Sequence, residues 1–172
     1  MVISTSGCVS QGNQTGNQTS AHAKTYAQNG ITFNYANTWQ EVQNQAPDTI
    51  AAVGDPKTAD SQTGNVKTSV AIQKLNNTSG FTLRQLYDGN YASYAAQNPS
   101  YQRISDANLT LSGTTAYENI YKADSNGVQN QERAVWMEKN NTVYVILCVS
   151  LPKDFNKEQE NFDLIINSFQ IQ

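Results

Sequence analysis

The sequence predicts an α+β domain built on a mainly antiparallel sheet with a helix on each face. Three observations predict it. Short segments with alternating apolar residues follow one another from residue 29 onward. Two segments, 81–99 and 154–169, have apolar residues at helical spacing instead. The segment 142–151 contains VYVILCV, which is apolar at odd and even positions alike and therefore predicts a central strand covered on both sides.

The first part of the folded region predicts short strands. GITFNYA places Ile31, Phe33 and Tyr35 on one face, the alternation typical of a half-buried strand. The short runs TWQEVQN and DTIAAVG follow. Gly, Pro, Asp and Ser residues at 54–65 then predict an exposed loop, and the alternation at 66–75 predicts a longer strand.

The segment 81–99 carries the signals of a helix with defined ends. Thr82 and Gln85 are spaced as a capping box, and Phe81 is placed to pack on the first turn. Pro99 ends the pattern. Gly89 lies inside it, where glycine weakens a helix.

The second half of the chain predicts a run of hairpins followed by a closing helix. Asn126-Gly127 is a strong signal for a two-residue hairpin turn. The closing helix has an apolar stripe that repeats at i, i+3, i+4 and i+7. The predicted strands are 101–112, 114–123, 129–139 and 142–151, and the stripe consists of Phe162, Ile165, Ile166 and Phe169.

The composition excludes some classes of partner. Charged residues make up only 15% of the 172 residues, the net charge is −3, and Asn plus Gln number 37. Binding to phosphate backbones needs clustered Lys and Arg, and the sequence has no such cluster. We therefore expect no nucleic-acid partner. No run approaches the roughly 18 apolar residues of a membrane span.

The N-terminal segment suggests a membrane anchor. Small residues precede Cys8 in the string TSGC, as they do at the lipidated cysteine of a bacterial lipoprotein. The polar run that follows cannot bury enough apolar surface to fold and predicts a flexible tether. We expect residues 1–28 to contain the lipidated cysteine and a flexible tether, and residues 29–172 to form the domain. We expect the protein to lie on the extracytoplasmic face of the cell membrane. The alternative is a disordered leader with an incidental cysteine.

Both ends of the folded region resemble one known family. GITFNYANTWQEV resembles the opening of PsbP-like domains, and YVILCVSLPKDFNKEQENFDLIINSFQI resembles their ending. The resemblance implies an α-β-α sandwich with a central, mainly antiparallel sheet over residues 29–172. Many prokaryotic proteins of this family are lipoproteins, so the resemblance also implies that this chain is a prokaryotic lipoprotein of the PsbP-like type. The family usually has Pro where this chain has Ala36, and no photosynthetic role is carried over.

Candidate catalytic and metal-binding residues are few. The only histidine, His22, lies on the tether, so a Ser-His-Asp or Cys-His site in the domain is excluded. Asp55 and Asp60 are weak candidates for a hard cation, against the simpler interpretation of a solvated loop. Glu118 and Glu132 are candidates for a carboxylate pair, against the alternative of a solvated face or of ion pairs with Lys122 and Arg133. We expect no catalytic residue, no metal and no cofactor.

Tyrosines are the remaining candidates for a site. Tyr91, Tyr101, Tyr117 and Tyr121 form a possible binding surface, since amphipathic aromatic side chains are common at interfaces. The alternative is that tyrosines at helical spacing pack in the core. Cys148, in an apolar strand, is expected to be a small buried hydrophobic residue.

These observations predict a function without enzymatic activity. We expect a membrane-anchored, extracytoplasmic docking or accessory module, held by a lipid on Cys8 and bound to a protein partner of a surface or membrane complex. The alternative is a carrier that binds a small ligand in an apolar pocket between sheet and helix, with a few convergent polar groups.

Overall fold

The structure is a computed structural model, and it describes residues 23–43, 46–125 and 127–172. Cys8, His22 and Asn126 lie outside these residues. The chain forms a seven-stranded antiparallel sheet of order β3-β4-β5-β9-β8-β7-β6 and a three-stranded sheet of order β1-β2-β10. The strands of the large sheet are β3 (Gln40–Glu41), β4 (Thr49–Gly54), β5 (Ser69–Asn76), β6 (Gln102–Leu111), β7 (Thr114–Ser125), β8 (Val128–Lys139) and β9 (Thr142–Ser150).

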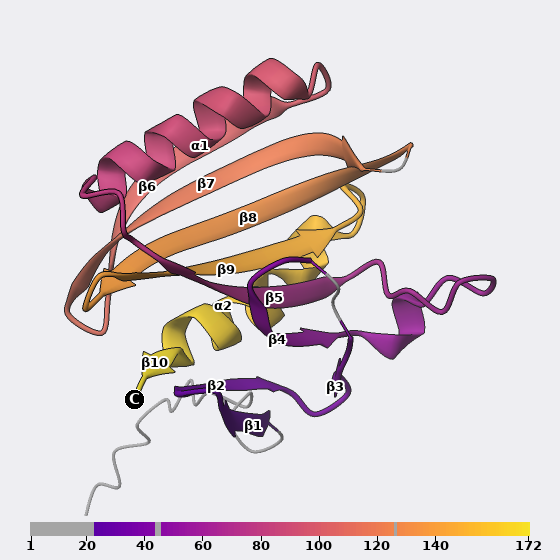
Figure 1. The fold of residues 1–172 in the computed structure, drawn as a ribbon. Coiled ribbons are helices and arrows are strands. Elements are labelled where there is room, and N and C mark those ends of the chain that lie inside the picture. Colours follow the sequence, from indigo (N-terminus) through magenta and orange to yellow (C-terminus); the bar gives the residue numbers. More distant parts are fainter. Residues whose placement is uncertain (1–22, 44–45, 126) are drawn as a thin grey trace, which may run out of the picture.

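Two helices lie on opposite faces of the large sheet (Figure 1). Helix α1 (Leu83–Gln97) packs on one face, and helix α2 (Gln159–Ser168) packs on the other. The small sheet, made of β1 (Ala23–Gln28), β2 (Ile31–Ala36) and β10 (Gln170–Ile171), shares the apolar core of α2. The α+β class and the sandwich of a central antiparallel sheet between helices are therefore confirmed.

The predicted helix signals correspond to real helix ends. Helix α1 begins after Thr82, whose side chain accepts a hydrogen bond from the Gln85 backbone while the Gln85 side chain accepts one from the Thr82 backbone. It ends at Gln97, two residues before Pro99. Helix α2 is shorter than predicted, because residues 155–158 form a 3-10 turn before it.

The hairpin prediction is confirmed by strand pairing. Strands β7 and β8 pair with Ser125 opposite Val128, so residues 126 and 127 form the link. Gly127 has φ of +77°, the left-handed conformation that this kind of turn requires. Strand β9 lies between β5 and β8 and is apolar on both faces, as predicted for a central strand.

The folded region starts earlier than expected. Strand β1 occupies residues 23–28, within the segment expected to be tether, and pairs with β2 along its whole length. Tyr26 is the one buried side chain of the six in β1, and its hydroxyl donates to the Ile50 carbonyl 3.1 Å away. A strand with one buried side chain shows no alternation, so its sequence resembles a polar linker.

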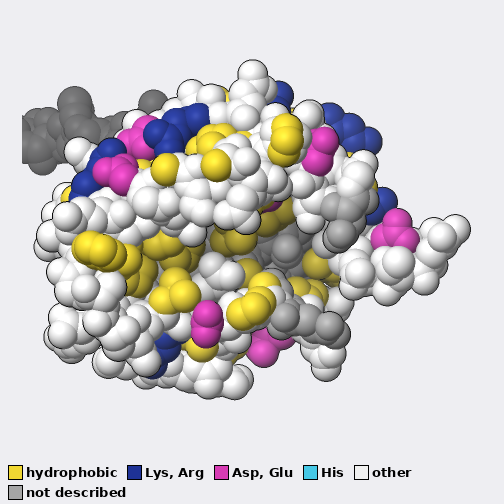
Figure 2. Space-filling model, turned by 45° about the horizontal axis from the view of Figure 1, so that its top comes forward, with side chains coloured by type: hydrophobic (Ala, Val, Ile, Leu, Met, Phe, Trp, Pro, Cys, Tyr) yellow, Lys and Arg dark blue, Asp and Glu magenta, His cyan; other side chains and the backbone are white. Residues whose placement is uncertain are grey.

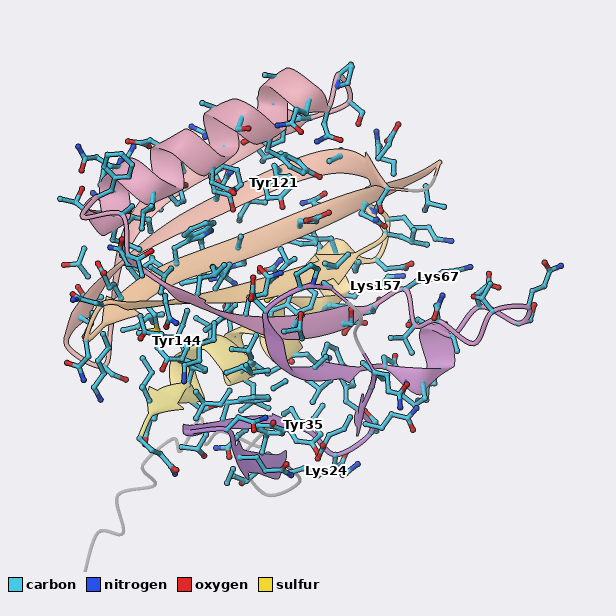
Figure 3. The ribbon with its side chains drawn as sticks, viewed as in Figure 1. Lys24, Tyr35, Lys67, Tyr121, Tyr144 and Lys157 are labelled. Carbon is cyan, nitrogen blue, oxygen red and sulfur yellow. The ribbon has the colours of Figure 1, made fainter. Side chains whose placement is uncertain are left out.

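The alternation within the central strands assigns each residue to one face. In β8, Val135 and Met137 point toward α2, whereas Ala134 and Trp136 point toward α1. Figure 3 shows the same division for two tyrosines: Tyr121 lies between the large sheet and α1, and Tyr144 lies on the side of α2. The face toward α1 carries the candidate site.

Candidate functional site

A groove runs along one side of α1, over the large sheet. Its volume is about 610 Å³. Figure 2 shows the hollow, with hydrophobic side chains gathered inside it. We call it the α1 groove and define its floor as the sheet residues Leu75, Ala134, Trp136, Val143, Val145 and Leu147.

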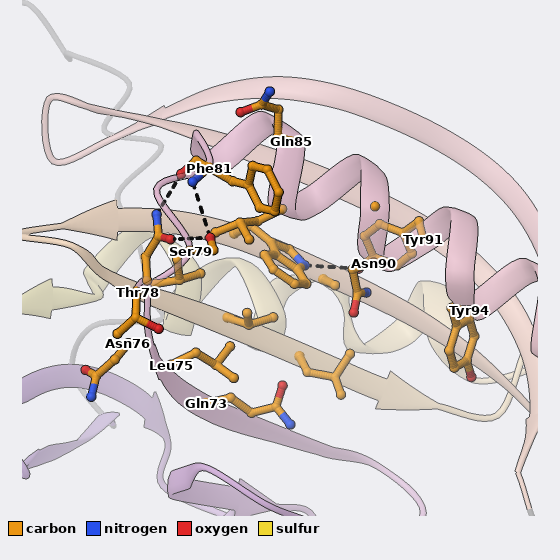
Figure 4. Close-up of a pocket in the computed structure, with 18 of the residues that line it drawn as sticks. Gln73, Leu75, Asn76, Thr78, Ser79, Phe81, Gln85, Asn90, Tyr91 and Tyr94 are labelled. Carbon is orange, nitrogen blue, oxygen red and sulfur yellow. Dashed lines mark hydrogen bonds between the residues drawn. The ribbon is translucent and has the colours of Figure 1, made fainter.

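The helix forms one wall of the α1 groove. Leu86, Tyr91 and Tyr94 line this wall, and the close-up in Figure 4 shows Tyr91 and Tyr94 on the helix above the sheet. Gly89 also lines it, and a Cβ atom built on Gly89 would meet no atom within 4 Å. Glycine costs a helix interior roughly 1 kcal/mol relative to alanine. The groove wall therefore has no side chain at this position, and the helix is less stable for it.

The rim of the α1 groove is polar but uncharged. Amide and hydroxyl side chains supply it, and none of the lining residues is Asp, Glu, Lys or Arg. Phe81 lies at the mouth, where 56% of its surface is exposed. The polar rim residues are Gln73, Asn76, Asn77, Thr78, Ser79, Gln85 and Asn90.

The segment before α1 is held in place by its own hydrogen bonds. Asn77 Nδ2 donates to Glu138 Oε1 at 2.9 Å and to the Phe81 carbonyl at 2.8 Å. Ser79 Oγ donates to Asn77 Oδ1 and accepts from the Phe81 backbone. These contacts, some of which are drawn in Figure 4, tie the rim to β8 and fix the mouth of the groove.

The predicted tyrosine surface lies under α1 rather than in the open. Tyr91 and Tyr121 are 3% and 5% exposed, and both line the α1 groove. Tyr101 and Tyr117 are half-buried beside them and are not part of the lining. The four residues belong to one aromatic cluster with Trp136, whose Nε1 donates to the Tyr91 hydroxyl at 3.1 Å.

Burial has a consistent electrostatic effect on the cluster. It raises the pKa of Tyr121, Tyr91 and Tyr94 above the ordinary value, and the negative charge of Glu132 raises each of them further. The three hydroxyls therefore stay protonated at physiological pH and act as neutral hydrogen-bonding groups.

The two candidate carboxylates lie on opposite faces of the sheet and do not form a pair. Glu132 points toward α1 and accepts a hydrogen bond from Tyr121 at 2.5 Å. Glu118 accepts from Arg133 Nε at 2.5 Å, and Arg133 also donates to Asp163 of α2 at 2.6 Å. The predicted ion pair with Arg133 therefore holds for Glu118 alone.

Sequence reasoning did not identify Glu132 as a buried group next to a groove. The signal that was missed is the alternation of side chains along β8. Glu132 is two residues before Ala134 and four before Trp136, so all three side chains point to the same face of the sheet. Burial raises the pKa of Glu132, although the hydrogen bond from Tyr121 opposes that rise.

The two loop aspartates stabilise turns. Asp55 accepts from the Lys57 backbone at the start of the short 3-10 turn Pro56–Thr58. Asp60 accepts from the backbone of Gln62 and Thr63, which lowers its pKa to about 2 together with the Lys67 ammonium 3.2 Å away. Within residues 23–43, 46–125 and 127–172, no three His, Cys, Asp or Glu side chains gather where they could hold a metal ion.

Two further observations bear on the predictions. Cys148 is fully buried in the core, which raises the pKa of its thiol. In the described part of the chain, no helix has the length and apolar character needed to cross a membrane.

Comparison with solved structures places the fold among known ones. The chain resembles the cyanobacterial PsbP (CyanoP) of Synechocystis sp. PCC 6803, with a TM-score of 0.65 and 16% identity over 97% of this chain and 98% of that one. It also resembles LpqN of Mycobacterium tuberculosis, described as involved in cell envelope biogenesis, with a TM-score of 0.59 and 13% identity over 88% and 91%.

A third similar structure comes from a eukaryote. The Ran-binding protein Mog1p of Saccharomyces cerevisiae aligns with a TM-score of 0.56 and 9% identity over 87% of this chain and 95% of that one. At these identities the likeness shows the fold alone. A comparison with curated protein sequences found no match. The family described as PsbP-like protein matches residues 3–171, so the chain belongs to the PsbP-like family.

Proposed function

We propose that this protein is an extracytoplasmic, membrane-anchored accessory domain that binds a small, largely apolar ligand in the α1 groove. The lipid on Cys8 is the anchor, and the domain has no enzymatic activity. Gly89 is the observation that carries the proposal, because it lines the groove without a side chain and a Cβ atom built there would meet no atom within 4 Å.

The groove suits a small molecule better than a flat protein surface. Ligand pockets have volumes of roughly 300–1,000 Å³, apolar walls and a few polar groups that orient the ligand. The α1 groove has about 610 Å³, an aliphatic and aromatic floor, and an uncharged polar rim. These features match a molecule with an apolar body that lies over Val143, Val145 and Trp136.

A non-enzymatic role is supported by the placement of the reactive groups. Glu118 and Glu132 lie on opposite faces of the sheet, and Cys148 is sealed in the core. The described residues therefore offer no carboxylate pair or exposed thiol in the α1 groove. Neutral tyrosines and amides bind and orient, but they supply no strong acid or base at neutral pH.

The place of the anchor is compatible with binding in the groove. Strand β1, which begins at Ala23, belongs to the small sheet that packs with α2. The α1 groove lies on the opposite face of the large sheet. A domain held at its N-terminus therefore leaves the groove accessible to a ligand.

Protein docking is a second candidate, and strand β6 favours it. This ten-residue strand is one of the two edge strands of the large sheet and is exposed over most of its length, with Ile104 49% exposed. An open edge can pair with an extended segment of a partner. A photo-crosslinker at Ile104, used in native membranes, should capture one partner protein, and labelling of lipids or nothing would exclude this route.

The ligand proposal can be tested with N-phenyl-1-naphthylamine, an uncharged apolar fluorescent probe. We expect the full chain to bind one probe molecule with increased probe fluorescence. Gly89→Leu should abolish the binding by filling the groove, whereas the matched control Gly89→Ala should retain most of it. Both variants should unfold at or above the wild-type temperature, because either residue favours the helix more than glycine does. Equal binding by the leucine variant would reject the proposal.

The anchor needs its own experiment. The native protein should be recovered in the membrane fraction, with a mass at the Cys8 residue increased by a lipid, and Cys8→Ser should move it to the soluble fraction. Recovery of unmodified Cys8 in soluble protein would exclude the anchor and leave the groove proposal unaffected.

A further inference from the structure

The floor of the α1 groove leads to a buried carboxylate. Along β8 the lining residues are Trp136 and Ala134, and Glu132 is the next residue on the same face. Its register partner on β7 is Tyr121, which itself lines the groove. Glu132 is not itself a lining residue, but it is adjacent to this end of the groove, and its carboxylate accepts a hydrogen bond from the Tyr121 hydroxyl.

One oxygen of Glu132 is satisfied and the other is open. Oε2 accepts from the Tyr121 hydroxyl at 2.5 Å. Among the described residues, no donor contacts Oε1. Two other side-chain oxygens, Thr49 Oγ1 and Asn119 Oδ1, are fully enclosed and have no partner, but Oε1 of Glu132 is not enclosed in this way. It follows that Oε1 still has accessible surface, although the residue as a whole is only 8% exposed.

Glu132 has no cationic partner within the described residues. Arg103, on the same side of the sheet, donates to the Tyr101 hydroxyl and pairs with Asp106 at 3.4 Å. Arg133 points to the other face, toward Glu118 and Asp163. A buried carboxylate without a cation is costly, and this cost is consistent with the raised pKa of Glu132.

Aromatic rings surround this position. Tyr121 lies 5.6 Å from Tyr91, 5.8 Å from Tyr94 and 5.3 Å from Tyr101, measured between ring centroids. Tyrosine rings attract ammonium groups through their electron-rich faces, most strongly where water is excluded. A carboxylate close to several tyrosine rings therefore favours a cation over an anion.

We propose that Glu132 and the tyrosines Tyr91, Tyr94 and Tyr121 form a seat for an ammonium group at the end of the α1 groove. This inference rests on the proposed ligand binding and names the class of ligand: an amine or quaternary ammonium attached to an apolar body. The body lies on the aliphatic floor, and the cation reaches the open Oε1 of Glu132. Because no described lining residue is charged, the charge of Glu132 selects the ligand.

Three probes with one alkyl chain test the inference: decylammonium, 1-decanol and decanoate, each below its micelle concentration. Their affinities are measured on the full chain at pH 7.5 by displacement of N-phenyl-1-naphthylamine. We expect decylammonium to bind about tenfold more tightly than decanol, and decanoate to bind most weakly. Glu132→Gln should lower the affinity for decylammonium to that for decanol without changing decanol binding.

A matched control separates a local effect from a change in net charge. Glu160→Gln removes one negative charge from an exposed position on α2, on the other face of the sheet, and should change none of the three affinities. Equal binding of decylammonium and decanol, or an ammonium preference that survives in Glu132→Gln, would overturn the inference and leave the groove proposal standing. Failure of the fluorescent probe itself to bind would overturn both.

Discussion

The two faces of the large sheet solve the problem of covering apolar surface in different ways. On the face toward α2, helix and small sheet together close one core in which Phe33, Phe162 and Ile165 are at most 1% exposed. On the face toward α1, a single helix covers part of the sheet through tyrosines, and the α1 groove remains beside it. The α2 face is therefore closely packed, whereas the α1 face is packed over only part of its area.

The charged groups follow the same division. On the α2 face, Arg133 bridges Glu118 and Asp163, so each buried charge has a partner. On the α1 face, the one hydrogen-bond partner of the Glu132 carboxylate among the described residues is the neutral Tyr121. The α1 face therefore has looser packing and an unpaired buried carboxylate that the α2 face lacks, and both features agree with the binding site that we propose there.

The largest expected effect comes from truncating the closed core. Phe162 is fully buried between the rings of Trp39 and Phe155, so Phe162→Ala should lower the free energy of unfolding by about 3–5 kcal/mol. Leu86→Ala, in the wall of the α1 groove, should cost less than about 1.5 kcal/mol because the site is already half-exposed. Urea unfolding followed by circular dichroism measures both.

Equal losses in these two variants would contradict the comparison of the faces. If Phe162→Ala does not fold, Ile165→Val supplies a milder test on the same face, with an expected loss of about 1 kcal/mol.

The second effect concerns the ion network of the α2 face. Arg133→Met removes the cation between Glu118 and Asp163 and leaves Glu118, which is 8% exposed, without its partner. We expect a loss of about 3 kcal/mol. Lys157→Met is the control, since Lys157 is exposed, pairs with Asp154 at the surface, and should cost less than about 1 kcal/mol. A similar loss in both variants would show that the network adds no more than a surface pair.

The third effect is the pH dependence caused by Glu132. Burial raises the pKa of Glu132 in the folded state above the unfolded value of about 4.3. At pH values between these two pKa values, folding is therefore accompanied by the uptake of a proton. The stability that Glu132 contributes is present below pH 4 and is lost as the pH rises through the folded pKa. Glu132→Gln should therefore gain stability relative to wild type between pH 4 and pH 7, in urea unfolding at a series of pH values. A constant difference across that range would contradict it.

The sequence predicted those parts of the fold that are encoded locally. The Thr82–Gln85 capping box, the α2 stripe and the two-residue link between β7 and β8 each depend on residues a few positions apart. Strand β1 was missed because it is held by pairing with β2 and by Tyr26 alone. The local pattern of apolar and polar residues does not reveal that a segment pairs with another strand.

The site was less predictable than the fold for a related reason. The parity of β8 already places Glu132 on the face of Trp136, and the spacing of α1 brings Tyr87, Tyr91 and Tyr94 together. Whether α1 covers the whole sheet or leaves a groove depends on its sideways position over β5, β8 and β9. That position results from packing between segments far apart in the chain, so the same tyrosines were equally compatible with a closed core.

The smallest expected effect on stability comes from the mouth of the α1 groove, where a change in binding should appear without a change in folding. Phe81 is 56% exposed, so Phe81→Ser should alter the free energy of unfolding by less than about 0.5 kcal/mol. It should nevertheless weaken binding of N-phenyl-1-naphthylamine severalfold, because Phe81 lines the groove. Ile104→Ser, at a comparably exposed residue on β6 outside the lining, is the matched control and should change neither quantity. If Phe81→Ser binds the probe as Ile104→Ser does, the exposed phenylalanine is not part of the binding surface, and the site is confined to the floor between α1 and the sheet.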